Sequence, residues 1–324
     1  RGVSPGRTTG SRRPPNVPGM TEIARELRTF WTEGRPVERV AYALAALFLL
    51  SGLAHLGIQA AVGGPWDGPV SWRKPTTFGL SFGLTVLSVT WVASFLRIGE
   101  RLRAGLLGGF LVASTAEVAL ITVQAWRRVP SHFNFETPFD TGVTMVLAAG
   151  GGVLFVVLGA LFAQSLRAQP LLAPELRLGI RLGFGALLAG LVTGAIMIGI
   201  GTVLVRGGDP QAAYHGAGVF KLAHAVGLHG IAVLPGVAWL SGLRSRDREH
   251  RAGSAGAMSP ELRLATAGYL GLLACALVAG AQGRLGALTV LGIALTGSVL
   301  LSALYRVLAA VLRGKRVVSG DTVR

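Results

Sequence analysis

Residues 40–62 read VAYALAALFLLSGLAHLGIQAAV and contain no Asp, Glu, Lys or Arg. A helix of this length covers the roughly 30 Å hydrocarbon core of a bilayer, because each helical residue rises about 1.5 Å. Lipid leaves backbone groups without hydrogen-bonding partners, so a buried segment must be a helix or a strand of a closed barrel. The sequence lacks the alternating pattern of barrel strands. The stretch therefore predicts a membrane-spanning helix.

Seven further stretches have the same character, and the only acidic residue inside them is Glu117. Hydrophobic residues make up 51% of the chain, charged residues only 14%, and the mean hydropathy is +0.56, which exceeds that of soluble domains. We predict an all-α fold, a polytopic transmembrane helix bundle of about eight spans within residues 37–313. The expected spans are 40–62, 76–96, 104–126, 141–165, 182–205, 217–243, 264–283 and 285–305.

The ends of the chain have a different composition. Residues 1–19 are rich in Arg, Pro and Gly and have almost no large apolar side chain, so we expect a disordered tail. Residues 20–36 place Ile23, Leu27 and Trp31 on one helical face, which predicts a short helix in the cytoplasmic interface. Residues 314–324 are expected to form a cytoplasmic tail.

The 31 Lys and Arg residues are distributed unevenly between alternate loops. With a cytoplasmic N-terminus, 24 of them fall in cytoplasmic segments, and this bias predicts that both termini are cytoplasmic. The net charge of +16 then reports topology and not a nucleic-acid partner. Arg outnumbers Lys 28 to 3, as in GC-rich bacteria. We therefore expect a multi-pass protein of the bacterial inner membrane, with the lipid bilayer as its partner.

Besides Lys221 near the start of the sixth span, four ionisable side chains fall inside the expected spans: His55, Glu117, His224 and His229. Each costs at least about 2.5 kcal/mol at mid-membrane, so such residues normally face the bundle interior. All four are expected at a similar depth, in the outer half or near the middle of the bilayer. We predict that they share one cavity open to the outer face and bind a small ligand, a divalent metal or a haem. The alternative is four separate structural hydrogen bonds.

Other polar residues extend this prediction. Stripes at helical spacing and the outer loops add candidate ligand-binding residues: Gln59, Lys74, Gln124, Arg128, His132, Asn134 and Lys221. Among them, Lys74, Arg128 and Lys221 are expected to neutralise an anionic group such as a phosphate or a propionate. The alternative for the loop residues is anchoring at the membrane interface.

Glycines and the single cysteine are interpreted as packing residues. The runs from Gly150 to Gly152 and from Gly190 to Gly194 predict close helix contacts, and Pro235 predicts a kink in the sixth span. Cys275 is the only cysteine, so no disulfide forms within the chain. No internal repeat is evident, and an inverted-repeat transporter is therefore not favoured.

Three segments resemble a family of uncharacterised multi-pass bacterial membrane proteins: WRKPTTFGLS at 72–81, QAWRRVPSHFN at 124–134 and HAVGLHGIAVLP at 224–235. The resemblance covers the first six spans and implies the same topology, but no reaction. In that family a glycine usually occupies the position of Arg128 and a glutamine that of Ala232.

The sequence leaves three functions open. The first is the ligand-, metal- or haem-binding membrane protein described above. The second is a small-solute transporter in which Glu117 and a histidine couple transport to protons. The third is an accessory membrane subunit without its own chemistry. Nucleotide-binding and hydrolase motifs are missing from the sequence, so whether the protein is an enzyme stays open.

Overall fold

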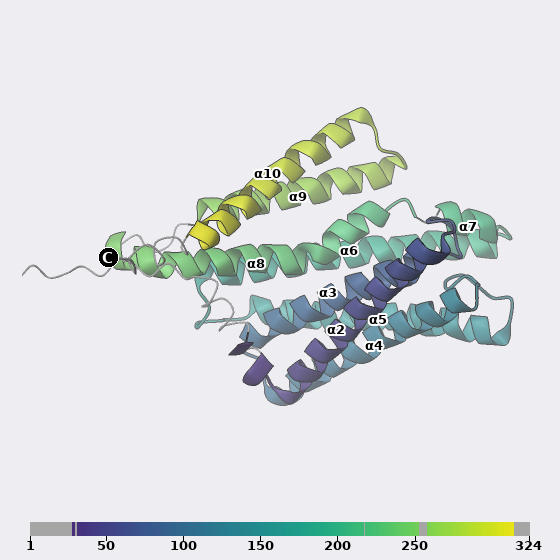
Figure 1. Ribbon diagram of the computed structural model, residues 1–324, viewed down its shortest axis with the longest axis horizontal. Helices are drawn as coiled ribbons and strands as arrows, with labels where there is room; N and C mark the ends of the chain where they lie inside the picture. The colour runs from purple at the N-terminus through teal and green to yellow at the C-terminus, as the bar shows by residue number, and fades with distance from the viewer. Residues whose placement is uncertain (1–27, 30, 217, 253–257, 314–324) are drawn as a thin grey trace, which may run out of the picture.

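The computed structural model describes residues 28–29, 31–216, 218–252 and 258–313. These residues form helices and contain no strand. The helices (Figure 1) are α2 Pro36–Val62, α3 Arg73–Phe95, α4 Glu100–Trp126, α5 Pro138–Leu166, α6 Pro174–Arg206, α7 Pro210–Gly216, α8 Lys221–Ala252, α9 Pro260–Gln282 and α10 Ala287–Arg313. Eight helices, all of these except α7, are long and apolar enough to cross a membrane. The chain is thus an all-α, multi-pass integral membrane protein, as predicted.

Most expected spans match a helix within a few residues. The sixth span differs, because α8 begins at Lys221 and continues to Ala252, and the short helix α7 precedes it. The expected tails at 1–19 and 314–324 lie outside the described residues, as does most of the expected interfacial helix at 20–36. Of that helix, residues 28, 29, 31 and 32 are described and helical.

Successive spanning helices run in opposite directions along the bundle, so the loops gather at its two ends, on the left and right of Figure 1. We call the end with α7 and loop 127–137 the α7 end, and the end with the first turn of α2 the Glu38 end. The helices form two groups, α2 to α5 and α6 with α8 to α10. The groups meet where α3 packs against α8 and α5 packs against α6. The hairpin of α9 and α10 leans away from the rest of the bundle in Figure 1.

The sides of the bundle are apolar, as a lipid-embedded surface requires. Large apolar side chains such as Val112, Val156 and Leu288 are 72%, 69% and 86% exposed. Buried polar residues instead face neighbouring helices, among them His55 and Glu117, which are 6% and 5% exposed. The interior also holds an apolar core, so the outer surface is as apolar as the inside, which agrees with helices surrounded by lipid.

Glycines bring two helix pairs into backbone contact. A Cβ atom added to Gly52 of α2 would lie 2.7 Å from the backbone nitrogen of Leu80 in α3, and one added to Gly190 of α6 would lie 2.7 Å from that of Leu228 in α8. The close packing predicted for Gly190 is therefore confirmed. Gly151 and Gly152 meet no atom within 4 Å, so the packing predicted for these two is wrong.

Candidate functional site

His55 of α2 uses both ring nitrogens inside the bundle. Its Nδ1 lies 2.7 Å from the carbonyl oxygen of Ser51, and the indole N–H of Trp126 in α4 donates to its Nε2 at 3.1 Å. A carbonyl only accepts, so Nδ1 carries the proton and Nε2 accepts, as one neutral tautomer allows. The ring also stacks on Trp72, with 6.1 Å between centroids. Since no ring nitrogen is left over, His55 does not fit the role of a metal or haem ligand.

Glu117 of α4 lies against helix α5. A Cβ atom added to Gly150 would stand 3.2 Å from Glu117 Oε1, so the missing side chain of Gly150 makes room for this carboxyl. No hydrogen bond or ion pair joins Glu117 to another described residue. It lies nine residues, or about 13 Å of helical rise, from Trp126, the partner of His55.

The two histidines of α8 point in different directions. His224 Nδ1 lies 2.7 Å from the carbonyl oxygen of Gly190, and its ring covers Gly194 of α6. His229 follows five residues later, about 140° around the helix, and its Nδ1 is buried without a hydrogen-bond partner. The packing predicted for Gly194 is therefore a contact with a histidine ring.

These contacts separate the four residues predicted to share a cavity. His55 belongs to the α2–α4 contact, Glu117 to α4–α5 and His224 to α6–α8. Nowhere in the described ranges do three His, Cys, Asp or Glu side chains stand close enough to hold a metal. Each of these three residues thus lies against its own helix pair, and the shared His/Glu site stays a prediction that no contact between the residues supports.

Three more of the predicted ligand residues hold loops and helix ends in place. Gln59 donates to the carbonyl of Gly64, just beyond the end of α2, at 3.1 Å. Gln124 donates to Asp140 Oδ1 at 2.8 Å and joins the end of α4 to the start of α5. Asn134, which is 1% exposed, accepts from the backbone N–H of Glu136 and donates to the carbonyl of Pro130. We assign these three residues a structural role.

Lys74 and His132 do come together, at the α7 end. The ammonium of Lys74, in the first turn of α3, donates to Ser131 Oγ at 3.3 Å, and Ser131 Oγ lies 3.0 Å from His132 Nδ1. Because Ser131 Oγ accepts from Lys74, its own hydrogen is free to donate to His132 Nδ1. A cavity of about 10 Å³, the size of one water, lies beside Lys74 and Ser131.

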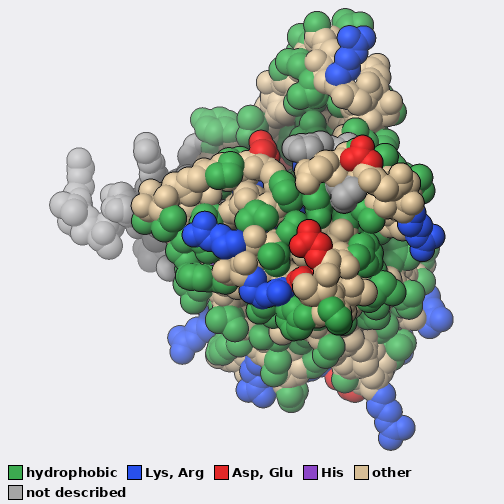
Figure 2. All heavy atoms as spheres, turned by 90° about the vertical axis from the view of Figure 1, so that its right-hand side faces the viewer, with side chains coloured by type: hydrophobic (Ala, Val, Ile, Leu, Met, Phe, Trp, Pro, Cys, Tyr) green, Lys and Arg blue, Asp and Glu red, His purple; other side chains and the backbone are tan. Residues whose placement is uncertain are grey.

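Further positive charge surrounds this contact. Arg73 and Lys221, the latter in the first turn of α8, lie close enough to repel the charge of Lys74. Burial, and then the charge of Lys74, lower the pKa of His132 from 6.5 to about 3, so this loop histidine is neutral. We call Lys74, Ser131, His132 and Lys221 the Lys74 cluster. Charged side chains of both signs gather on this end face (Figure 2).

Arg128 lies next to the cluster in an unusual backbone conformation. Its φ is +60°, in the left-handed region, and its guanidinium stands 5.7 Å from the ring of Trp72. A non-glycine residue in this region costs on the order of 1–3 kcal/mol. The cation–π contact with Trp72 offsets part of this cost.

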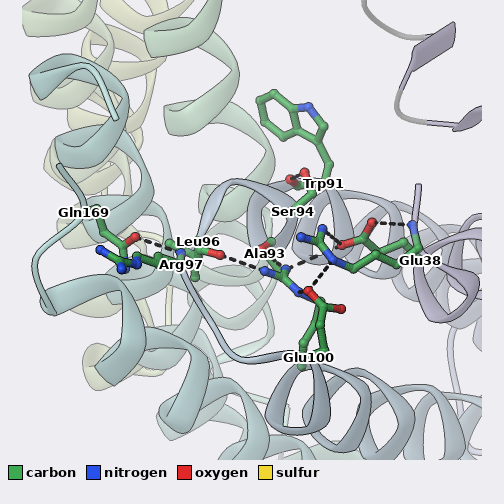
Figure 3. A network of polar contacts seen from close by, with 10 residues as sticks. Glu38, Trp91, Ala93, Ser94, Leu96, Arg97, Glu100 and Gln169 are labelled. Atoms are coloured by element: carbon green, nitrogen blue, oxygen red, sulfur yellow. Dashed lines mark hydrogen bonds and ion pairs between the residues drawn. The ribbon is translucent and has the colours of Figure 1, made fainter. Parts of the chain in front are cut away.

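Sequence reasoning missed a polar network at the Glu38 end (Figure 3). Arg103 of α4 was counted as a loop charge, yet its side chain is 2% exposed, and it pairs with Glu38 of α2 at 3.5 Å. It also donates to the carbonyls of Ala93 and Leu96, which end α3. The signal in the sequence was the pair of opposite charges at the starts of two spans.

The same network has an exposed part. Arg35 bonds Glu38 at 3.1 Å and Glu100 at 2.8 Å, and the side chain of Glu100 is 68% exposed. Nearby, the side-chain oxygen of Gln169 accepts from the backbone N–H of Arg97. The network therefore ties together the first turns of α2 and α4 and the last turn of α3.

No protein-family model, curated protein or solved structure matches the chain. The family resemblance of residues 72–81, 124–134 and 224–235 therefore stays a prediction.

Proposed function

We propose that this integral membrane protein binds a small anion, a phosphate or a carboxylate, at the Lys74 cluster. The observation that carries the proposal is the unpaired charge of Lys74. Its ammonium contacts one hydroxyl, and among the described residues no carboxylate lies within 4.0 Å of Lys74 or Lys221. A half-buried charge without a counter-ion is unfavourable, and a bound anion removes that cost.

The neighbouring arginine shows the contrast. Arg73 pairs with Asp67 at 3.4 Å and donates to the carbonyl of Trp66 at 3.0 Å, so its charge is already balanced. Lys74, one residue further on, has two ammonium hydrogens left after its bond to Ser131. The first turns of α3 and α8 add the positive ends of their helix dipoles.

The chemistry of the cluster selects an oxygen acceptor. With Ser131 donating to His132 Nδ1, the neutral imidazole carries its hydrogen on Nε2, so lysines and histidine alike present donors. A phosphate or carboxylate supplies several acceptor oxygens at once. By the bias of the basic residues, we assign the α7 end to the outer face, so the anion reaches the cluster from outside the cell.

A pair of adjacent charge-removing variants tests the proposal. Lys74→Gln and Arg73→Gln each delete one positive charge, but only Lys74 lacks a counter-ion. With inorganic phosphate as the probe, we expect Lys74→Gln to weaken binding at least about tenfold, the value of one charge-assisted hydrogen bond, and Arg73→Gln to change it less than about threefold. Isothermal titration of the purified protein in detergent measures both.

Equal losses in the two variants, or no phosphate binding by the parent protein, would show that the cluster is no anion site. A second arm separates free phosphate from a lipid headgroup. Mass spectrometry of the protein released from nanodiscs containing phosphatidylglycerol detects retained lipid. Lipid lost in Lys74→Gln and kept in Arg73→Gln identifies the headgroup as the source of the anion.

A further inference from the structure

The packing of α2 against α3 is repeated, atom for atom, by α6 against α8. A Cβ on Gly79 would lie 2.8 Å from the carbonyl oxygen of Phe48, and one on Gly227 would lie 2.9 Å from that of Ala186. Gly52 approaches Leu80 N as Gly190 approaches Leu228 N. Residues of α2 thus correspond to residues 138 positions later in α6, and residues of α3 to those 148 positions later in α8.

Burial follows the same two offsets. Each of the six buried residues of α2 maps onto a buried residue of α6: Glu38, Ala41, Ala45, Phe48, Gly52 and His55 onto Leu176, Gly179, Gly183, Ala186, Gly190 and Thr193. In the third pair, α5 and α10, buried residues match at an offset of 146: Val143, Leu154, Val157 and Leu161 with Thr289, Leu300, Ala303 and Val307. Unrelated helices that happen to pack alike would have no reason to keep one constant residue offset along their length.

Residue identities agree with the offsets without a gap inside any helix. The matches between α2 and α6 are Pro36/Pro174, Arg39/Arg177, Leu44/Leu182, Leu49/Leu187, Leu50/Leu188, Gly52/Gly190, Leu53/Leu191 and Ile58/Ile196. Those between α3 and α8 are Gly79/Gly227, Leu80/Leu228, Val89/Val237 and Trp91/Trp239. Those between α5 and α10 are Gly151/Gly297, Val153/Val299, Leu154/Leu300, Leu158/Leu304, Ala163/Ala309, Leu166/Leu312 and Arg167/Arg313. The differences between offsets fall in loops, where insertions are tolerated.

Three of the four helices in the first group, α2, α3 and α5, are therefore repeated in the second group as α6, α8 and α10, so residues 36–167 and 174–313 are two copies of one unit. Corresponding helices run in the same direction, so the relating axis follows the membrane normal. Trp91 contacts its own equivalent Trp239, with 5.8 Å between ring centroids, which places the axis between α3 and α8. The absence of an internal repeat, inferred from the sequence, was wrong.

The axis passes between two helix faces of mixed polarity. On α3, the face opposite the glycine seam carries Lys74, Thr77, Ser81 and Ser88 at helical spacing. On α8, the corresponding face carries His229, the equivalent of Ser81, whose Nδ1 has no partner.

Exposure along this seam changes with depth. Ser88, one turn from Trp91, is 3% exposed, whereas Thr77 and Ser81, nearer the α7 end, are half-buried. The seam is thus closed around Ser88 and the Trp91–Trp239 contact, and it is more exposed towards the α7 end. Parallel repeats with a polar midplane seam are a common architecture of transporters.

We infer that the α3/α8 seam between the two duplicated units is a water-accessible path for a small anionic solute, entered at the Lys74 cluster and closed by Trp91 and Trp239. The inference rests on the proposed anion site for the identity of the solute, but its route depends only on the repeat and the seam. Such a path makes the chain a transporter of the anion, and not a protein that only binds it.

Cysteine accessibility tests the route in the full-length protein. In a Cys275→Ala background, Ser81→Cys and Ser88→Cys report on the seam, and Leu87→Cys, whose native side chain is 41% exposed on a different face of α3, is the control. In intact cells or proteoliposomes, we expect an impermeant methanethiosulfonate at the α7 end to modify Ser81→Cys at least about tenfold faster than Leu87→Cys, because the thiolate forms only in water. With reagent at the Glu38 end of inside-out vesicles, Ser88→Cys should react only after Trp91→Ala is added, because Trp91 lies between Ser88 and that end.

Each possible result tests a separate part of the inference: the path, its closure or its solute. Equal rates at Ser81→Cys and Leu87→Cys would mean a dry seam and overturn the path, even if phosphate still binds. A Ser88→Cys that reacts with reagent at the Glu38 end while Trp91 is intact would overturn the tryptophan closure. Inorganic phosphate should slow modification of Ser81→Cys, and Lys74→Gln should abolish this protection. A reactive Ser81→Cys without phosphate protection would keep the path and refute its anionic solute.

Discussion

The buried ion pair between Glu38 and Arg103 offers the sharpest test of the energetics. Both side chains are 2–3% exposed and their charged atoms are 3.5 Å apart. Arg35 forms an ion pair with Glu38 and another with Glu100, whose side chain is 68% exposed. Glu38→Gln and Glu100→Gln therefore each remove one carboxylate that pairs with Arg35, but Glu38 is buried and Glu100 is exposed.

The structure sets the expected magnitudes. Removing one partner of a buried ion pair costs about 3–5 kcal/mol, because the other charge stays buried without compensation. Arg103 keeps its bonds to the carbonyls of Ala93 and Leu96, so we expect Glu38→Gln to lie near the lower limit, about 3 kcal/mol. Glu100→Gln breaks exposed pairs and should cost less than about 1 kcal/mol.

Unfolding by sodium dodecyl sulfate in mixed micelles, followed by tryptophan fluorescence, measures both variants. Combining Glu38→Gln with Arg103→Met completes a double-mutant cycle, and we expect a coupling of about 1–3 kcal/mol, since each change removes the other's partner. Equal costs for Glu38→Gln and Glu100→Gln, or additive effects in the cycle, would refute the assignment of this network as a buried electrostatic tie.

Two further predictions concern Glu117 and His132. Gly150→Ala places a methyl group 3.2 Å from Glu117 Oε1 and should lower the free energy of unfolding by about 1 kcal/mol. Gly151→Ala, whose methyl group meets no atom within 4 Å, should not lower it. Adding Glu117→Ala to Gly150→Ala should restore the stability, and unfolding titrations measure all three variants. The pKa of His132 is about 3 in the folded state and 6.5 when unfolded, so its contribution to stability is complete above pH 6.5 and falls as the pH decreases towards 3. Between pH 6.5 and 5 the parent protein should lose about 1–2 kcal/mol of stability that His132→Gln does not lose, and a pH-independent difference between them would contradict this.

Helical spacing predicted which residues share a helix face, but not which helix they meet. His55, Glu117 and His224 were expected to converge because lipid excludes all three, and the bundle interior does hold each of them. An interior made of several helix pairs offers several separate polar environments. Gly150 and Gly194 make room for Glu117 and His224 and so decide this distribution, and the sequence alone does not show which side chain a glycine will face.

The internal repeat is a second feature that the sequence alone did not reveal. The identities between the two halves were present in the sequence, but loops of unequal length separate them, and apolar helices resemble each other by composition alone. Only the close approaches at Gly52 and Gly190 fixed the register in which the identities become significant.

By itself, the sequence determined that eight apolar segments form helices, because the cost of an unpaired backbone in lipid is a property of each segment alone. It also drew attention to the loop with His132 and to the lysines at the starts of α3 and α8. The tertiary structure decided which charges are buried pairs, as with Arg103 and Glu38, and which lack a partner, as with Lys74. Pairing depends on distances between helices far apart in the chain, and local patterns carry no information about those distances.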